Sequence, residues 1–416
     1  MKKIKAIDLF AGCGGLMDGF EQSGHYITLA AVEWEKAPCD NLRQRMKDKW
    51  HIKDADKRVL QFDIQRTEEL FEGWDDESYG KSDGLNRLIE SANGLDIIIG
   101  GPPCQAYSIA GRVRDENGMR DDYRNYLFES YLKVVSKYKP KLFVFENVPG
   151  MLSAQPGDRP IIEIIKESFN QAGYYVLPDL RNAVIDFTEY GVPQNRNRVI
   201  IIGASKEYFG ETTAEKMVEQ FYSSFLPKYK VTRKRTVRDA IADLPKLYPL
   251  KNEMKYEGKR LSHSLPDPFM ANHVARWQSK RDIDIFELLT KDIESGRCEY
   301  VTTESLKALY TEKTGKVSNV HKYHVLRWDE PSNLIPAHLY KDGLRHIHPD
   351  SAQLRTITVR EAARLQTFPD DYIFYGGSME VYKMIGNAVP PLFSKALANA
   401  VYDLLKKYNK ENVAEE

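Results

Sequence analysis

The stretch IKAIDLFAGCGG (residues 4–15) decides the fold that the sequence predicts. Its first half is an apolar run with the length of a buried strand, and its second half is rich in glycine and leads into a helical pattern. Glycines between a strand and a helix let the backbone turn tightly and approach a ligand closely. We therefore predict a strand followed by a loop that binds a nucleotide-type cofactor.

Four further apolar runs follow before residue 204, namely YITLAAVEW, LDIIIGG, PKLFVFENV and RVIIIGAS. Helix-length segments such as 124–136 and 161–172 separate them. This alternation predicts an α/β fold with a doubly wound, mostly parallel sheet that helices cover on both faces. Residues 65–94 are acidic and rich in turn-forming residues, and we expect them to be a solvated surface insertion.

The character of the sequence changes after this region. Residues 205–345 lose strand periodicity and become basic and aromatic, which predicts a smaller, irregular second domain. Residues 346–416 return to helical patterns, and Pro390-Pro391 is typical of a helix start. We expect a catalytic and cofactor-binding domain at 1–204, the irregular domain at 205–345, and a C-terminal segment at 346–416 that returns to the first domain.

The composition narrows the class of protein. The 416 residues are 42% hydrophobic and 29% charged, with no apolar run that could span a bilayer and no signal-peptide core. We expect a cytoplasmic protein without a membrane partner. Lysine plus arginine and aspartate plus glutamate both number 60, so a nucleic-acid surface has to be local. The four cysteines lack a C-x-x-C spacing, and we expect no metal.

One local basic run lies in the irregular region and has no acidic residue within it: Lys228, Lys230, Arg233, Lys234, Arg235 and Arg238. Such a run suits a polyphosphate backbone. Taken alone, however, it favours the alternative of a solvated protein surface.

Residues at the expected strand ends suit a cofactor. Glu33 ends the second apolar run, where a carboxylate can accept hydrogen bonds from ribose hydroxyls, and Trp34 offers a flat face for an adenine. Asp63 also follows apolar sequence. Met17 stands where the dinucleotide fingerprint needs a third glycine, which disfavours a nicotinamide cofactor.

Cys104 lies in GGPPCQAYS (residues 100–108), just past the expected strand 95–101. A lone cysteine is most often inert packing, which is our interpretation of the other three. Glu146, however, ends the next apolar run, so that a thiol and a carboxylate at neighbouring strand ends could act as nucleophile and acid on one small substrate. The polar loop 105–125 is a candidate to close over that substrate.

The segment QNRNR (residues 194–198) leads directly into RVIIIGAS. Gln194, Arg196 and Arg198 fall on one face if the segment is extended. Their guanidinium groups could hold a base carbonyl or a phosphate. The alternative is an edge strand with solvated arginines.

The order of these motifs resembles that of the bacterial cytosine-5 DNA methyltransferases. The motifs are, along the chain, DLFAGCGG, Glu33-Trp34, Asp63-Ile64, GGPPCQAYS, Glu146-Asn147-Val148, QNRNR, REAARLQTFPDDY and GNAVPP. The resemblance covers nearly the whole chain, except 65–94 and the middle of 205–345. It implies a class I, Rossmann-like methyltransferase fold, with a target-recognition domain at 205–345.

The resemblance also implies roles for the matched residues. S-adenosylmethionine would be bound by Phe10, Gly12, Gly14, Glu33, Trp34, Asp63, Ile64, Pro102 and Asn387. Cys104 would attack cytosine, Glu146 would engage its N3 atom, and Arg196 with Arg198 would hold and activate the ring. Tyr107 stands where the family commonly has phenylalanine, which keeps the aromatic body.

The implied function is methylation at C5 of a flipped-out cytosine in double-stranded DNA. We expect a monomer, with a cognate restriction endonuclease as a candidate partner. A tRNA cytosine-5 methyltransferase is one alternative, which the size of region 205–345 disfavours. A catalytically silent DNA-binding relative is the other, and the combination of Cys104 with Glu146 disfavours it.

Overall fold

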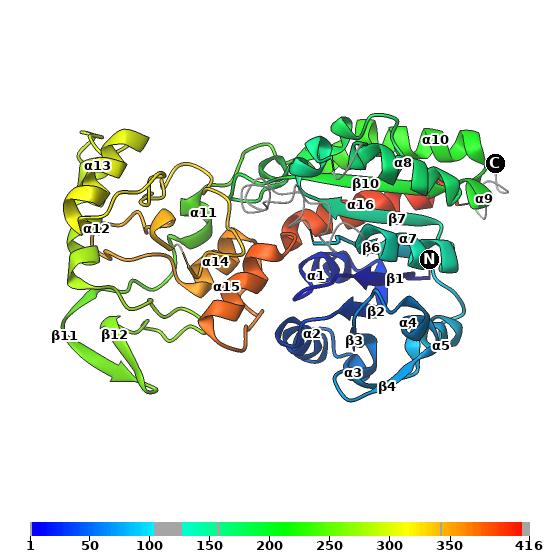
Figure 1. Ribbon diagram of the computed structural model, residues 1–416, viewed down its shortest axis with the longest axis horizontal. Coiled ribbons are helices and arrows are strands. Elements are labelled where there is room, and N and C mark those ends of the chain that lie inside the picture. Colours follow the sequence, from blue (N-terminus) through cyan, green and yellow to red (C-terminus); the bar gives the residue numbers. More distant parts are fainter. Residues whose placement is uncertain (1, 104–126, 156–158, 342, 410–416) are drawn as a thin grey trace. The chain divides into compact units, whose positions relative to one another are not determined.

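The computed structural model describes residues 2–103, 127–155, 159–341 and 343–409 (Figure 1). The chain forms two compact units. Unit 1 comprises Met1–Gly191, Arg196–Thr232 and Ala388–Glu416, and unit 2 comprises Val192–Asn195 and Arg233–Asn387. The sequence predicted domains with boundaries after residues 204 and 345, and it assigned a functional role to each. That division by role stays a prediction.

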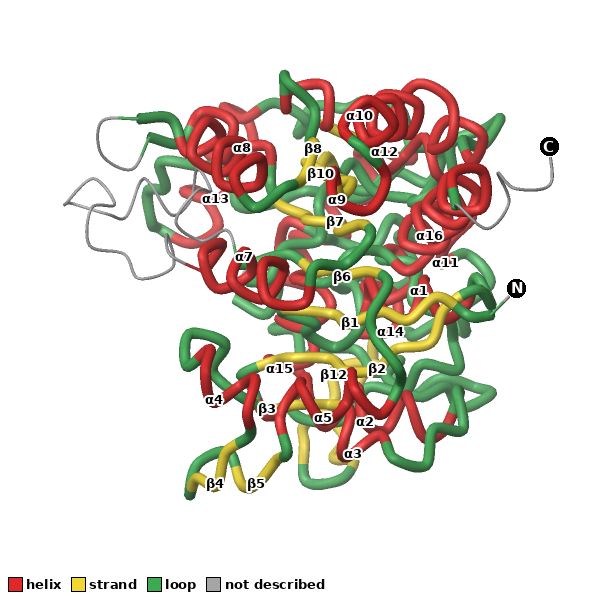
Figure 2. The backbone as a smooth tube through the Cα atoms, turned by 90° about the vertical axis from the view of Figure 1, so that its right-hand side faces the viewer, coloured by secondary structure: helices red, strands yellow, loops and turns green. Residues whose placement is uncertain are grey.

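Unit 1 is built on a mixed sheet with the strand order β3-β2-β1-β6-β7-β10-β8, and β9 pairs with β10. The strands are β1 (Ile4–Leu9), β2 (Tyr26–Glu33), β3 (Val59–Gln61), β6 (Ile97–Gly100), β7 (Leu142–Asn147), β8 (Tyr174–Tyr175), β9 (Val184–Asp186) and β10 (Asn197–Ser205). Strands β3, β2, β1, β6 and β7 pair in parallel, in that order. Strand β10 is antiparallel to its neighbours. Figure 2 shows the strands in succession with helices on both sides. The predicted fold class is confirmed, and all five apolar runs form strands.

Ten α-helices surround this sheet in the described part of unit 1. They are α1 (Gly15–Gln22), α2 (Lys36–Asp48), α3 (Ala55–Arg58), α4 (Thr67–Glu72), α5 (Gly84–Ser91), α7 (Leu127–Tyr138), α8 (Ile161–Gln171), α9 (Lys206–Phe209), α10 (Glu211–Gln220) and α16 (Pro391–Tyr408). Helix α16 begins at Pro391, as its sequence predicts, and packs on α1. Phe393, Leu397 and Leu404 on its buried face are fully inaccessible to solvent. The last helix is therefore part of the core of unit 1.

The expected surface insertion at 65–94 is folded, so that the prediction of a solvated excursion was wrong for its apolar residues. It contains α4, a hairpin of β4 (Trp74–Asp76) and β5 (Gly80–Ser82), and α5. Leu70 and Leu85 are fully buried, and the Trp74 ring stacks on Phe62 at a centroid distance of 3.9 Å. The acidic residues of this segment suggested a solvated loop. Its apolar residues instead form the buried side of the crossover between β3 and β6.

Unit 2 contains little sheet. Its elements are α11 (Val237–Ile241), β11 (Pro249–Tyr256), β12 (Lys259–His263), α12 (Lys280–Glu294), α13 (Thr303–Thr314), α14 (Val359–Leu365) and α15 (Ser378–Asn387). Apolar residues of α12 and α13 pack with Tyr323, Val325 and Ile347 from the following loops. Strands β11 and β12 pair only with each other among the strands that the structure describes.

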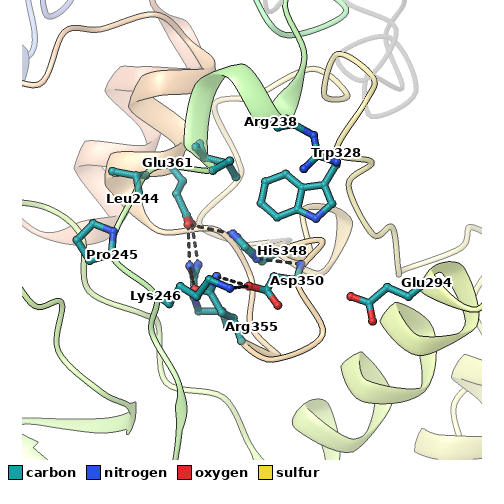
Figure 3. Close-up of a pocket in the computed structure, with 13 residues that line it drawn as sticks. Arg238, Leu244, Pro245, Lys246, Glu294, Trp328, His348, Asp350, Arg355 and Glu361 are labelled. Carbon is teal, nitrogen blue, oxygen red and sulfur yellow. Dashed lines mark hydrogen bonds and ion pairs between the residues drawn. The ribbon is translucent and has the colours of Figure 1, made fainter.

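A buried ion pair stabilises the part of unit 2 around α14 (Figure 3). The Arg355 guanidinium donates to both carboxylate oxygens of Glu361 at 2.6 and 2.7 Å, and both side chains are at most 1% exposed. The same carboxylate accepts from the Thr358 backbone N–H at 2.7 Å and so caps α14. Burial alone would raise the pKa of Glu361, but Arg355 holds it well below its usual range. Arg355 and Glu361, with His348, line a cavity of about 320 Å³.

Replacing Arg355 by methionine should destabilise unit 2 by about 3–5 kcal/mol, because the Glu361 carboxylate would stay buried without its cation. Denaturant unfolding monitored on unit 2 measures this change. The matched control is Lys280→Met, which breaks an exposed pair with Asp284 and should cost about 0–1 kcal/mol. Equal losses in the two variants would contradict the importance of the buried pair.

Four histidines of unit 2 are held in the neutral form. Burial lowers the pKa of His263 and His324 from 6.5 to about 4, and that of His346 and His348 to about 3. Nearby cations act in the same direction, Arg355 on His263 and His348 and Arg345 on His324 and His346. Each of these rings is neutral in the folded chain at a pH where the unfolded chain binds a proton.

Unit 2 should therefore lose stability as the pH falls below about 6.5, and the loss should continue towards pH 4 to 3. Well below pH 6.5 each histidine contributes about 1.4 kcal/mol per pH unit, and near pH 6.5 it contributes less because the unfolded chain is only partly protonated there. The loss for the four between about pH 7 and about pH 5.5 is therefore roughly 5 kcal/mol. Hydrogen exchange of α12 and α14 at several pH values, corrected for the intrinsic exchange rate, measures this loss. Peptides from β1 and β7 of unit 1 in the same samples are the control. Unchanged protection of α12 and α14 at pH 5.5 would refute the prediction.

Candidate active site

The strand order of unit 1 creates a binding edge. Strands β1 and β6 are parallel neighbours, and the chain proceeds from β1 to β2 and β3 on one side but reaches β6 and β7 on the other. Open α/β sheets bind ligands outside the carboxyl ends of the strands at such a switch point. The residues that follow β1, β2, β3, β6 and β7 therefore meet at one edge.

Glu33 fastens the loop after β1 to the end of β2. Its Oε2 atom accepts a hydrogen bond from the Gly12 backbone N–H at 2.9 Å, and its Oε1 atom accepts from the Glu35 N–H at 2.8 Å. Burial raises the pKa of Glu33, and these two hydrogen bonds lower it. Gly12 has a φ of 55°, and Phe10 adopts a similar left-handed conformation with a φ of 59°. Such a conformation costs a bulky residue about 1–2 kcal/mol, which fits a loop shaped for binding.

The structure brings several of the predicted cofactor residues to this edge. Gly14 precedes α1, and Trp34, directly after Glu33, is 52% exposed. The Phe62 N–H donates to the Glu33 carbonyl at 3.0 Å, so that Asp63 and the buried Ile64 follow beside the end of β2.

Asn387 belongs to the other unit, because it ends α15 in unit 2. Its chain neighbour Ala388 belongs to unit 1, where a Cβ atom added to Gly15 would lie 2.9 Å from the Ala388 Cβ atom. The chain therefore passes from the last residue of α15 directly into a residue that contacts the start of α1.

The segment after β6 packs against Glu146. A Cβ atom on Gly101 would lie 2.6 Å from the Glu146 Oε2 atom, so that only glycine fits there. The carbonyl of the buried Pro102 accepts a hydrogen bond from Asn147 Nδ2 at 3.3 Å. The description of this segment ends at Pro103, and Cys104 and the loop 105–125 lie outside the described residues.

Glu146 and Arg198 form an ion pair at the same edge. The distance between Arg198 Nε and Glu146 Oε1 is 2.9 Å, and the side chains are 12% and 14% exposed. The pair forms because β10 is antiparallel to β7, which places the first residues of β10 beside the last residues of β7. Its geometry leaves the carboxylate held in place and only partly accessible.

The three side chains of QNRNR that were expected to share one face have different partners. The Arg196 guanidinium, 2% exposed, donates to the Ala388 carbonyl at 3.0 Å, whereas Gln194 belongs to unit 2 and donates to the Leu365 carbonyl. Arg198 is the one that reaches Glu146. The alternative of solvated arginines on an edge strand was wrong, because β10 lies between β7 and β8.

Asp8 lies within the motif DLFAGCGG, and no role for it was predicted from the sequence. It is 1% exposed near the end of β1, and burial raises its pKa well above the usual value. The Met17 backbone N–H donates to its carboxyl group, and its Oδ2 atom has no hydrogen-bond partner among the described residues. The signal in the sequence was a carboxyl group inside an otherwise apolar strand.

Acidic residues from elsewhere in the chain pair with the basic run. Lys230 pairs with Glu189 at 2.7 Å, Arg233 with Asp239 at 2.9 Å, and Arg238 with Asp329 at 2.9 Å. Carboxylates from outside the run therefore compensate the charges of these three cations. This favours the alternative that the run is a solvated protein surface.

Of the other cysteines, Cys13 and Cys39 are buried as expected, whereas Cys298 is exposed. No helix in the described ranges is long and apolar enough to cross a membrane.

Comparisons with known proteins agree with this arrangement. The family model of the C-5 cytosine-specific DNA methylases matches residues 4–403. Type II methyltransferase M.Bpa9945I of Bacillus paralicheniformis is 36% identical over 97% of this chain and 99% of that protein. Type II methyltransferase M1.HphI of Haemophilus parahaemolyticus is 32% identical over 95% of this chain and 86% of that protein.

A solved E. coli structure, a candidate DNA modification methyltransferase encoded within a prophage, shares the fold with a TM-score of 0.58 at 22% identity. The match covers 97% of this chain and 100% of that one. With a family model that spans nearly the whole chain, the protein belongs to the C-5 cytosine-specific DNA methylase family and is a DNA (cytosine-5-)-methyltransferase.

Proposed function

We propose that the protein transfers a methyl group from S-adenosylmethionine to C5 of a cytosine that is flipped out of double-stranded DNA. The observation that carries this proposal is the Glu146–Arg198 ion pair at the edge that also holds the Gly12–Glu33 loop. Because its curated relatives are type II methyltransferases, we also propose that it protects DNA within a restriction-modification system.

The residues at the strand ends fit S-adenosylmethionine. The position above Gly12 is open, since an added Cβ atom would meet no atom within 4 Å, and the exposed Trp34 ring can stack on an adenine. The buried Asp8 carboxyl, with its unpartnered Oδ2 atom, suits a cationic group nearby. Phe10, Gly12, Gly14, Glu33, Trp34, Asp63, Ile64, Pro102 and Asn387 would hold the cofactor. When bound, it supplies an electrophilic methyl group.

Cys104 would begin the reaction by attack on cytosine C6. The C5 atom is a poor nucleophile, and addition of a thiolate at C6 converts the ring into an enamine that can accept the methyl group. Negative charge builds on the pyrimidine as the thiolate adds. A proton shared between N3 and Glu146, with Arg198 beside it, would lower this barrier. Once C5 carries the methyl group, a base would take the C5 proton, the C5–C6 double bond would re-form and the C6–S bond would break, so that Cys104 leaves as the thiolate.

The target base has to leave the helix for this chemistry. Neither face of a stacked cytosine is accessible, and flipping costs a few kcal/mol. The Arg198 side chain fixes the Glu146 carboxylate before the base arrives, so that less ordering is needed on binding. Arg196 and Arg198 would hold the flipped ring, and loop 105–125 would close over it.

Cys104→Ser should abolish methylation and should leave S-adenosylmethionine binding within about twofold of wild type. DNA that contains 5-fluorocytosine at the target should form a denaturation-resistant adduct with wild type only, because fluorine blocks the release of the enzyme. An adduct that the serine variant forms as readily as wild type would rule out Cys104 as the nucleophile. Bisulfite sequencing of host DNA and tRNA identifies the methylated polymer.

Glu33→Ala should weaken S-adenosylmethionine binding by about tenfold or more, because the variant loses both a ribose acceptor and the hydrogen bond that fastens Gly12. Titration calorimetry measures the affinity directly. Glu35→Ala, two residues further along, is the matched control and should bind as wild type does. Wild-type affinity of the Glu33 variant would remove Glu33 from the cofactor site.

A further inference from the structure

We propose that residues 65–94 belong to the cofactor site, because a stack of Trp74 on Phe62 fixes the place of the Asp63 carboxylate. This inference rests on the proposed function, in which Asp63 is one of the residues that hold S-adenosylmethionine. It assigns Trp74 as a positioning residue, which acts on the cofactor through Phe62 and Asp63. A carboxylate held in this way suits the exocyclic amino group of the adenine, which donates hydrogen bonds.

Asp63 lies between a buried core residue and the start of the segment. Phe62, its chain neighbour, is fully inaccessible to solvent. On the other side, the Asp63 Oδ1 atom accepts a hydrogen bond from the Gln65 backbone N–H at 3.0 Å, and the Asp63 carbonyl accepts from the Arg66 N–H at 3.0 Å. Such a turn fixes the direction of the carboxylate relative to its own backbone. The place of the carboxylate therefore depends on how firmly Phe62 is held.

Three side chains of the segment 65–94 surround the Phe62 ring. The Trp74 indole stacks on it at a centroid distance of 3.9 Å and an interplanar angle of 23°. Tyr79 meets it edge-on at 5.2 Å, and the Arg66 guanidinium lies 4.8 Å from its centroid. Aromatic and cation–π contacts of this kind depend on orientation as well as on burial. The Phe62 ring cannot turn without breaking them, so that the residue that follows it is held as well.

An ion pair holds the hairpin that carries Trp74. The Arg66 guanidinium pairs with Asp76, the last residue of β4, at 2.7 Å. The Asp76 Oδ1 atom also accepts hydrogen bonds from the Ser78 and Tyr79 backbone N–H groups at 2.8 and 3.1 Å. Arg66 lowers the pKa of Asp76 below its usual value, so that the carboxylate stays charged at neutral pH. The turn of the hairpin is therefore tied to the residue that precedes α4.

The base of the hairpin is tightly packed, which a solvated insertion would not need. A Cβ atom added to Gly84 would lie 2.5 Å from the Phe71 carbonyl oxygen and 2.5 Å from the Gly73 nitrogen. Only glycine allows the two ends of the hairpin to approach so closely. Phe71 is buried and meets the Tyr138 ring of α7 edge-on at 5.5 Å. The segment thus connects Phe62 to the helices that cover the sheet.

The test compares S-adenosylhomocysteine with its analogue in which hydrogen replaces the 6-amino group of the adenine. Titration calorimetry on the full chain measures both affinities. Wild type should bind the analogue at least about tenfold more weakly, because the Asp63 carboxylate has no donor to accept from. In Trp74→Leu this ratio should fall to about threefold or less, while the affinity for the analogue stays within about threefold of wild type. A merely destabilised fold would weaken the binding of both ligands by the same factor and leave the ratio unchanged.

Two variants serve as controls. Trp74→Phe keeps an aromatic ring beside Phe62 and should retain the wild-type ratio. Phe169→Leu removes a buried ring that stacks at 4.2 Å on Phe143, the second residue of β7, at the amino end of that strand. It should lower the stability of unit 1 and should also retain the wild-type ratio. If Trp74→Leu does not fold, Arg66→Met, at a partly exposed position, should lower the ratio in the same direction.

The outcomes separate this inference from the function on which it rests. A wild-type ratio in Trp74→Leu would overturn the positioning role, and so would an equal fall of the ratio in Phe169→Leu. If wild type binds both ligands equally well, Asp63 does not accept from the amino group and the inference fails, whereas methylation of DNA still tests the proposed function by itself. Failure of wild type to bind either S-adenosylmethionine or S-adenosylhomocysteine would refute the proposed function.

Discussion

The antiparallel register between β7 and β10 is the constraint on which the proposed active site depends. Parallel strands bring only their carboxyl ends to the binding edge, and Glu146 arrives there at the end of β7. Because β10 runs the other way, it contributes its first residues, and Arg198 reaches the Glu146 carboxylate at 2.9 Å. A fully parallel sheet would place the arginine at the opposite edge. One reversed strand thus supplies the cation of the site.

The cofactor side of the site depends on a second anchor of the same kind. The Glu33 carboxylate joins the loop after β1 to the end of β2 through the Gly12 N–H, and the left-handed backbone at Phe10 is maintained by these surroundings. Asp8, near the end of β1, is buried, and its Oδ2 atom has no hydrogen-bond partner among the residues that the structure describes. The strained backbone at Phe10 and the buried Asp8 carboxyl group thus both lie where we propose that a cationic cofactor binds.

Unit 2 uses buried charge differently. Arg355 and Glu361 pair without access to solvent, and the capped start of α14 depends on the same carboxylate. Histidines that burial keeps neutral, such as His263 and His348, also lie in the core of this unit. The unit contains little β-sheet. The same polar core holds the start of the loop after β12, because His263 Nε2 lies 2.8 Å from the Gln353 carbonyl oxygen.

The sequence by itself determined the order of the strands along the chain, the glycine loop after β1, and the strand-end positions of Glu33 and Glu146. These features are local, because a buried parallel strand is a continuous apolar run and a tight turn needs glycine. It missed the buried side of residues 65–94, the carboxylates that pair with three cations of the basic run, and the separate partners of Gln194, Arg196 and Arg198. Only the tertiary structure decided these, because burial and ion pairing depend on residues brought together from distant parts of the chain.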